Sequence, residues 1–87
     1  MARYELTFRP SVLEDMERIP KKDVKRILIR IEALRYDPRP AGSRKLSGMD
    51  YYRIRQGNYR IVYEIADAVL IVTVIKVGHR KDVYKMK

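Results

Sequence analysis

The strongest constraint on the fold lies in residues 51–63, where two stretches of alternating side chains flank the dipeptide Gly57-Asn58. A glycine at the first position of a two-residue turn suits a tight β-hairpin. Such a turn also determines which residues of the two strands face each other, and here it places Arg55 opposite Arg60. The stretch therefore predicts an antiparallel strand pair with a defined register.

This register sorts the side chains of the hairpin onto the two faces of a sheet, because neighbouring side chains along a strand point in opposite directions. One face would carry the arginine trio, Arg53, Arg55 and Arg60, and the other would carry Tyr52, Ile54, Ile61 and Tyr63. Like charges that face each other destabilise a sheet. The trio could be a solvated face, but three arginines side by side favour a site for an anion, whose oxygens the planar guanidinium group can bind in pairs.

The charge of the whole chain agrees with this hypothesis. Its 87 residues include 20 Lys and Arg against 11 Asp and Glu, which gives a formal net charge of +9. Residues 39–87 hold eleven basic and four acidic groups, so most of the excess lies in the half that contains the hairpin. Nucleic acid is the commonest partner of such a field, and acidic proteins and anionic lipids are its rivals.

Other function classes are excluded by what the sequence lacks. Without cysteine there is no disulfide framework and no thiolate metal site. The sequence has no glycine-rich phosphate loop, nucleophile elbow or metal-binding helix motif, and we expect no metal and no cofactor. It also has no apolar run that could span a bilayer and no signal segment, so we expect one cytoplasmic domain over residues 1–87.

The first half of the chain predicts one strand and two helices. Residues 4–8 alternate in polarity as a half-buried strand does. Pro10 suits the first turn of a helix, which would end at Pro20. Apolar residues at helical spacing predict a second helix over residues 21–36. The two helices should form a hairpin on one face of a sheet.

The second half predicts a loop followed by three strands. Prolines and a glycine mark residues 37–44 as a loop. The hairpin follows, and the β-branched run at 69–77 predicts a central strand buried on both faces. Residues 80–87 would form a polar tail or a last helical turn. The expected fold is α+β with the order β-α-α-β-β-β, a small, mainly antiparallel, twisted sheet with a helical hairpin on one face.

Candidate site residues outside the hairpin follow the predicted central strand. Arg80 and Lys81 would add positive charge, and Tyr84 lies in a charged tail where little else could bury it. His79 is the only histidine, which excludes an acid–base ribonuclease that needs two histidines. A lone histidine is more often structural than catalytic, but its position beside Arg80 keeps it as a candidate functional group.

Four segments resemble the RelE/ParE toxin superfamily, on its RelE side. They are Lys45-Leu-Ser-Gly-Met, Tyr52-Arg-Ile-Arg, Gly57-Asn-Tyr-Arg-Ile-Val-Tyr and Val77-Gly-His-Arg-Lys-Asp-Val-Tyr. The resemblance implies a type II toxin that cleaves messenger RNA in the ribosomal A site and is neutralised by a cognate antitoxin. It implies a metal-independent endoribonuclease in which the 2′-hydroxyl attacks the neighbouring phosphate.

The resemblance places the family's catalytic positions on Arg53, Arg55, Arg60, Arg80 and Tyr84. Within it we expect Arg60 and Arg80 to clamp the phosphate and Tyr84 to stack on a base or orient the leaving group. Arg53, Arg55, Lys45 and Lys81 would bind RNA. The best-known family pattern has lysines where this chain has Arg53, Arg55 and His79. Because arginine stays protonated in proteins, the acceptor of the 2′-hydroxyl proton is open, and His79 has a suitable intrinsic pKa.

Two alternatives remain at this level. A toxin of the ParE type would inhibit DNA gyrase by binding it and would cut no RNA, because a shared fold does not determine function. A plain RNA- or ribosome-binding module would bind without cleavage. For the toxin readings we expect an acidic or amphipathic antitoxin that wraps the helical hairpin, and no membrane partner.

Overall fold

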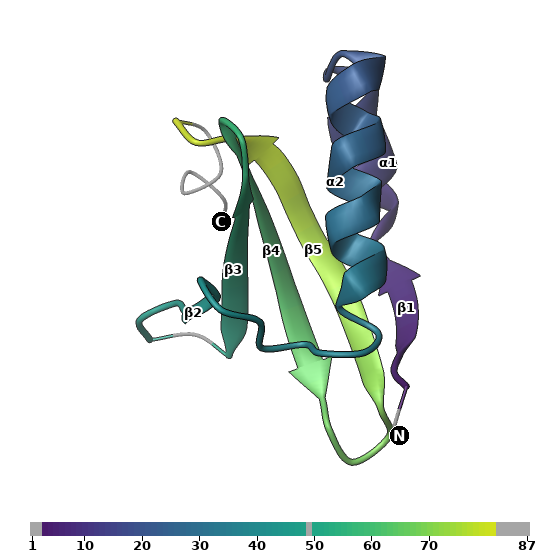
Figure 1. Cartoon of the computed structure of the whole chain (residues 1–87), viewed down its shortest axis with the longest axis vertical. Coiled ribbons are helices and arrows are strands. Elements are labelled where there is room, and N and C mark those ends of the chain that lie inside the picture. The colour runs from purple at the N-terminus through teal and green to yellow at the C-terminus, as the bar shows by residue number, and fades with distance from the viewer. Residues whose placement is uncertain (1–2, 49, 82–87) are drawn as a thin grey trace.

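The computed structural model describes residues 3–48 and 50–81, which form two helices and a five-stranded mixed sheet (Figure 1). In chain order the elements are β1 (Glu5–Phe8), α1 (Pro10–Glu17), α2 (Lys21–Ala33), β2 (Arg44–Lys45), β3 (Tyr51–Gln56), β4 (Tyr59–Ala66) and β5 (Ile71–His79). The strands lie in the order β1-β5-β4-β3-β2, with β1 parallel to β5 and the other pairs antiparallel. The predicted α+β class and the central position of the last strand are confirmed.

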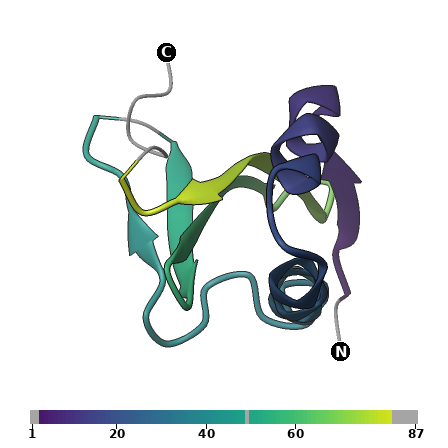
Figure 2. The same ribbon diagram turned by 90° about the horizontal axis from the view of Figure 1, so that it is seen from above.

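The main core lies between the helices and one face of the sheet. Fully buried side chains from α1, α2 and the three long strands meet there, among them Val12, Ile27, Ile31, Ile61 and Tyr63. In the view from above, both helices lie toward the β1 end of the strand order, with α1 beside β1 and β2 on the opposite side of the molecule (Figure 2). The predicted helical hairpin on one face is therefore present.

Helix α1 also covers part of an edge of the sheet. Strand β1 pairs with β5 only as far as Val74, which leaves the next backbone groups of β5 without a strand on that side. The carboxylate of Asp15, on α1, accepts a hydrogen bond from the backbone N–H of Val77 at 3.2 Å. It also accepts one from Lys76 Nζ at 2.9 Å. Asp15 thus satisfies a buried donor that would otherwise be unpaired.

The hairpin has the register expected from its turn. Gly57 has a φ of +60°, a conformation that glycine adopts without strain, and Arg55 faces Arg60. Between β4 and β5 the register shifts, so that Val62 faces Lys76 while Tyr63 faces Val74. The residue left over, Ile75, is a β-bulge.

The bulge supports a second, smaller apolar cluster on the face without helices. Ile75 and Val62 are buried there, and Leu46 and Tyr51 pack against them. The register places this cluster on the face that carries the arginine trio, because Val62 faces Arg53.

Element boundaries differ from the sequence prediction at the end of α2, at β2 and at both ends of β5, which extends to His79 and not only to residue 77. Helix α2 ends at Ala33 and not at residue 36, and β5 begins at Ile71 after a turn in which Leu70 has a φ of +55°. Strand β2 was not expected, because a two-residue strand beside a proline-rich loop exists only through its pairing with β3. The predicted tail over residues 80–87 lies almost wholly outside the described residues.

Within residues 3–48 and 50–81, neither helix has the length and apolar character needed to cross a membrane.

Candidate functional site

The arginine site lies where the β3–β4 turn and the end of β5 meet, at one end of the sheet (Figure 1). Arg55 and Arg60 face each other across β3 and β4, and Arg60 faces Gly78 on β5. The backbone N–H of Arg80 donates a hydrogen bond to the carbonyl of Asn58 at 2.8 Å, which holds the segment after β5 against the turn. The structure therefore brings Arg55, Arg60 and Arg80 to the same end of the sheet.

Two arginines of the trio are withdrawn from solvent without a counter-charge. Arg53 is only 5% exposed, and Arg60 is half-buried. The Nε atom of each is buried and has no hydrogen-bond partner. Among the described residues, the ion pairs involve neither of them. A guanidinium group in this state is costly unless an anion binds to it.

The two predicted RNA-binding lysines lie apart from this arrangement. Lys45 faces Tyr52 across β2 and β3, so alternation puts it on the face opposite to Arg53, and its Nζ lies 3.8 Å from the carboxylate of Asp50. Lys81 is exposed in the turn after β5. Tyr84 lies outside the described residues.

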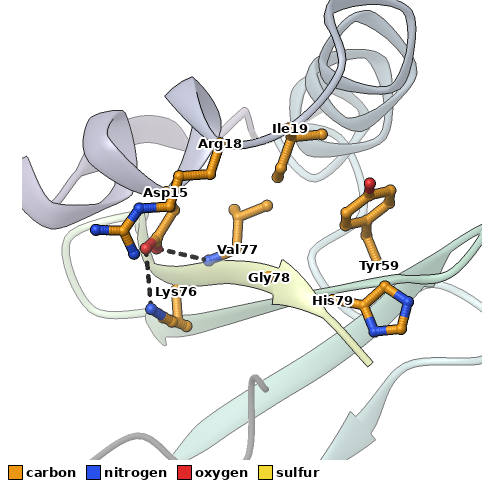
Figure 3. A pocket seen from close by; sticks show the side chains of 8 residues that line it. All are labelled: Asp15, Arg18, Ile19, Tyr59, Lys76, Val77, Gly78 and His79. Carbon is orange, nitrogen blue, oxygen red and sulfur yellow. Dashed lines mark hydrogen bonds and ion pairs between the residues drawn. The ribbon is translucent and has the colours of Figure 1, made fainter. Parts of the chain in front are cut away.

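His79 lies on the helix-covered face of the sheet. It faces Tyr59, and the two rings meet edge to face with their centroids 6.0 Å apart. Both rings line a hollow of about 310 Å³ (Figure 3). Its other walls include Asp15 of α1, and Arg18 and Ile19, which follow α1. The structure therefore does not bring His79 together with Arg55 and Arg60, which point from the other face.

His79 makes two contacts that shape the local fold. Its Nδ1 atom accepts a hydrogen bond from the backbone N–H of Lys81 at 3.2 Å, which shapes the turn after β5. The ring also packs against Tyr59, which belongs to the margin of the main core. These contacts explain the residue without assigning it a proton-transfer step.

The structure adds site candidates that the sequence did not indicate. Arg44 of β2 faces Arg53 of β3, which makes a second pair of arginines directly opposite each other. Arg30 of α2 lines a hollow together with Arg44 and Arg53. Nothing local in the sequence marks either residue, because both reach the site through contacts between distant segments. In the part of the chain that the structure describes, no group of three or more His, Asp or Glu side chains could hold a metal ion.

The family described as "ParE toxin of type II toxin-antitoxin system, parDE" matches residues 6–84. The chain belongs to the RelE/ParE toxin superfamily. Its relatives include a candidate RelE-like toxin protein of Escherichia coli, 32% identical over 89 residues that cover 97% of this chain and 93% of the relative.

Solved RelE structures have the same fold as this toxin. The RelE–RelB complex of Pyrococcus horikoshii OT3 matches with a TM-score of 0.80 and 27% identity, over 90% of this chain and 96% of that one. The intact RelBE toxin–antitoxin complex of E. coli matches with a TM-score of 0.75 and 30% identity, over 87% and 95% of the two chains. The superfamily assignment made from the sequence motifs is thereby confirmed.

Proposed function

We propose that this toxin is a metal-independent endoribonuclease that cleaves messenger RNA in the ribosomal A site. The observation that carries the proposal is the arginine face, where Arg55 faces Arg60 and the buried Arg53 has no ion pair among the described residues. RNA supplies both the anionic backbone that such a face binds and the 2′-hydroxyl that can attack the neighbouring phosphate. The RelE relatives support the RelE type of activity over other activities of the superfamily.

In the proposed reaction, the 2′-oxygen bonds to phosphorus and the bond to the 5′-oxygen breaks. The products are a 2′,3′-cyclic phosphate and a 5′-hydroxyl end, and the proton lost by the 2′-hydroxyl is balanced by the one that the leaving oxygen gains. Arg60 and Arg80 clamp the phosphate and stabilise the charge that develops on it. Arg53 and Arg55 hold the backbone, with Lys81 further out, and Tyr84 stacks on a base or orients the leaving group.

The proton acceptor in this mechanism is not an arginine, because the guanidinium group stays protonated. His79 lies on the other face of the sheet, beside Tyr59. The surrounding guanidinium groups, or a group of the ribosome, therefore activate the 2′-hydroxyl. This places the catalytic power of the chain in electrostatic stabilisation rather than in a general base.

The proposed partner is a cognate antitoxin that covers the helices. Leu13 on α1 is 63% exposed, and Leu28 and Ile29 on α2 are 43% and 63% exposed. An amphipathic segment could bury these side chains while its acidic groups meet the positive charge of the sheet. The RelE proteins of P. horikoshii and E. coli were solved as complexes with RelB, which agrees with such a partner.

Primer extension on translating ribosomes, with and without the purified toxin, tests the proposed activity. We expect new 3′ ends within the A-site codon. Because the proposed reaction needs no metal, these ends should also form when EDTA is added at a concentration that leaves the ribosome intact. A message with a 2′-deoxy nucleotide at the scissile position is the control and should stay whole. An absence of toxin-dependent ends on ordinary messages would overturn the proposal.

The family match keeps one alternative, a ParE-type toxin that inhibits DNA gyrase without cutting RNA. A supercoiling assay separates the two activities. Inhibition of gyrase by a toxin that leaves ribosomal messages intact would establish the alternative.

A further inference from the structure

A second cationic feature lies at the β3 edge of the sheet, close to the arginine site but separate from its catalytic end. It is a hollow of about 220 Å³, lined by Arg30 of α2, Gly42 of the preceding loop, Arg44 of β2, and Arg53 and Arg55 of β3. None of its lining residues is acidic. In the part of the chain that the structure describes, the ion pairs involve none of these four arginines.

The backbone keeps this hollow open. Strand β2 pairs with β3 only at Tyr52 and Arg53, so it does not cover the edge of β3 beyond Arg53. The loop before β2 makes a turn in which the N–H of Ser43 donates to the carbonyl of Pro40 at 2.9 Å, and Gly42 adopts a φ of +89°. No other atom lies within 4 Å of the position that a Cβ at Gly42 would take, so free space adjoins this wall of the hollow.

The electrostatics of the hollow call for an anion. Arg44 and Arg53 face each other directly, an arrangement that destabilises a sheet when nothing neutralises it. Arg53 is 95% buried, and no group among the described residues forms a hydrogen bond with its Nε. A charge withdrawn from water to this extent is stable only beside an opposite charge that also accepts its hydrogen bonds.

We propose that this hollow binds a backbone phosphate of single-stranded RNA, next to the phosphate that is cleaved. The inference rests on the proposed action on messenger RNA and assigns Arg30 and Arg44 as additional RNA-binding residues. Arg55 lines the hollow and also faces Arg60, so positive charge is continuous from the hollow to the catalytic end. A polyanion with regularly spaced phosphates can occupy both places at once, and guanidinium groups bind phosphate oxygens in pairs.

Binding of a 2′-O-methyl RNA decamer, followed by fluorescence anisotropy at several salt concentrations, tests this site. The probe cannot be cut, and the assay contains no ribosome. Arg30→Gln and Arg44→Gln should each weaken binding about tenfold or more, the effect of losing a charged hydrogen bond. Each should also lower the slope of log affinity against log salt by about 0.7, the value for one phosphate contact on a single strand.

Lys25→Gln is the matched control. Lys25 is exposed on the same helix as Arg30 and lies about 140° around its axis, so the substitution removes the same charge without touching the hollow. Its effect on RNA affinity should be much smaller than that of Arg30→Gln. Equal losses in all three variants would mean that only net charge matters, and would overturn the inference.

Two further measurements define what occupies the hollow. Inorganic phosphate should shift the side-chain Nε–H signals of Arg30, Arg44 and Arg53 in ¹⁵N NMR spectra, and a titration that leaves them in place would contradict the site. A polyglutamate decamer tests for an acidic protein segment instead. If Arg30→Gln and Arg44→Gln weakened binding of the peptide but not of the RNA, the hollow would belong to a protein partner and the RNA assignment would be wrong.

These results are independent of the cleavage assay. If the toxin bound the decamer through Arg30 and Arg44 but left ribosomal messages whole, the RNA site would be upheld and the proposed cleavage would be wrong. If the wild-type toxin cleaved messages but both glutamine variants bound the decamer normally, the proposed cleavage would be upheld and the RNA site would be wrong.

Discussion

At the scale of single residues, Arg60 and Arg80 are the side chains on which the proposed chemistry depends most. Arg60 is half-buried with an unpartnered Nε, and the backbone of Arg80 is tied to the β3–β4 turn. Preorganised donors of this kind stabilise a transition state because they need no reorganisation when charge develops. The local fold thus orders the side chain of Arg60, whereas Arg80 is exposed and is positioned through its backbone alone.

We therefore expect Arg60→Ala and Arg80→Ala each to slow single-turnover cleavage on ribosomes by about 10²- to 10³-fold, or roughly 3–4 kcal/mol of barrier. Arg18→Ala, which removes an exposed arginine at the end of α1, is the control and should cleave normally. Arg60→Ala also relieves the repulsion from Arg55 across the strands, so its thermal stability should not fall. If both variants cleaved at the wild-type rate, neither Arg60 nor Arg80 would take part in the mechanism.

For His79 we expect the opposite result, namely that its substitution hardly changes cleavage. Because it faces Tyr59 on the helix-covered side of the sheet, His79→Ala should keep cleavage close to wild type and leave the pH profile near neutrality unchanged. The measurement is the cleavage rate on ribosomes between pH 6 and 8. Loss of activity together with loss of that pH dependence would instead identify His79 as the general base.

At the scale of elements, the hairpin was predictable because a two-residue turn determines its own register. The face of the sheet on which His79 lies could not be predicted, and the reason is equally specific. Val72 and Val74 point into the main core, and unbroken alternation from them would put His79 on the arginine face. The bulge at Ile75 reverses the alternation, so that Val77 and His79 point to the helices.

Other parts of the site depend on contacts between distant segments. Strand β2 consists of two residues and exists through its pairing with β3. Asp15 binds the N–H of Val77, 62 positions away in the chain. No local periodicity marks such residues, which is why the arginine trio was found from the sequence but Arg30 and Arg44 were not.

A buried tyrosine helps to hold the loop between α2 and β2. The hydroxyl of Tyr63 donates to the carbonyl of Pro38 at 2.6 Å, and burial raises the pKa of Tyr63 from 10.0 to about 12. Tyr63→Phe should lower the free energy of unfolding by about 1–2 kcal/mol, because the carbonyl loses its partner. Chemical denaturation measures the loss, and Tyr36→Phe, at an exposed position, is the control.

The same tyrosine predicts a dependence of stability on pH. Its folded-state pKa lies above the unfolded value, so the stability that it contributes is complete below pH 10 and is lost as the pH rises toward 12. The difference in unfolding free energy between wild type and Tyr63→Phe should therefore shrink across this window. A difference that stays constant from pH 9 to pH 12 would show that the ionisation of Tyr63 is not coupled to folding.

At the scale of the whole molecule, the two faces of the sheet have separate tasks. One face and both helices enclose the main core, while the other carries a small apolar cluster and arginines that form no ion pair within residues 3–48 and 50–81. Because the core lies on the far side, the arginines can be removed without emptying it. The net charge of +9 is therefore tolerated by the fold and is available for binding.

This separation allows a test of toxicity in which stability is not a confounding factor. Expression of the chain alone should stop bacterial growth, because the proposed cleavage in the A site would halt translation, and co-expression of a cognate antitoxin should restore growth. The Arg60→Ala, Arg80→Ala double variant should accumulate as folded protein and leave growth normal. Its far-UV circular dichroism spectrum should match that of wild-type toxin that has been separated from its antitoxin, since neither arginine contributes to the main core. Normal growth during strong expression of the folded wild-type chain would contradict the toxin function itself, whereas arrest by the double variant would show that binding to a cellular target, without cleavage, is sufficient.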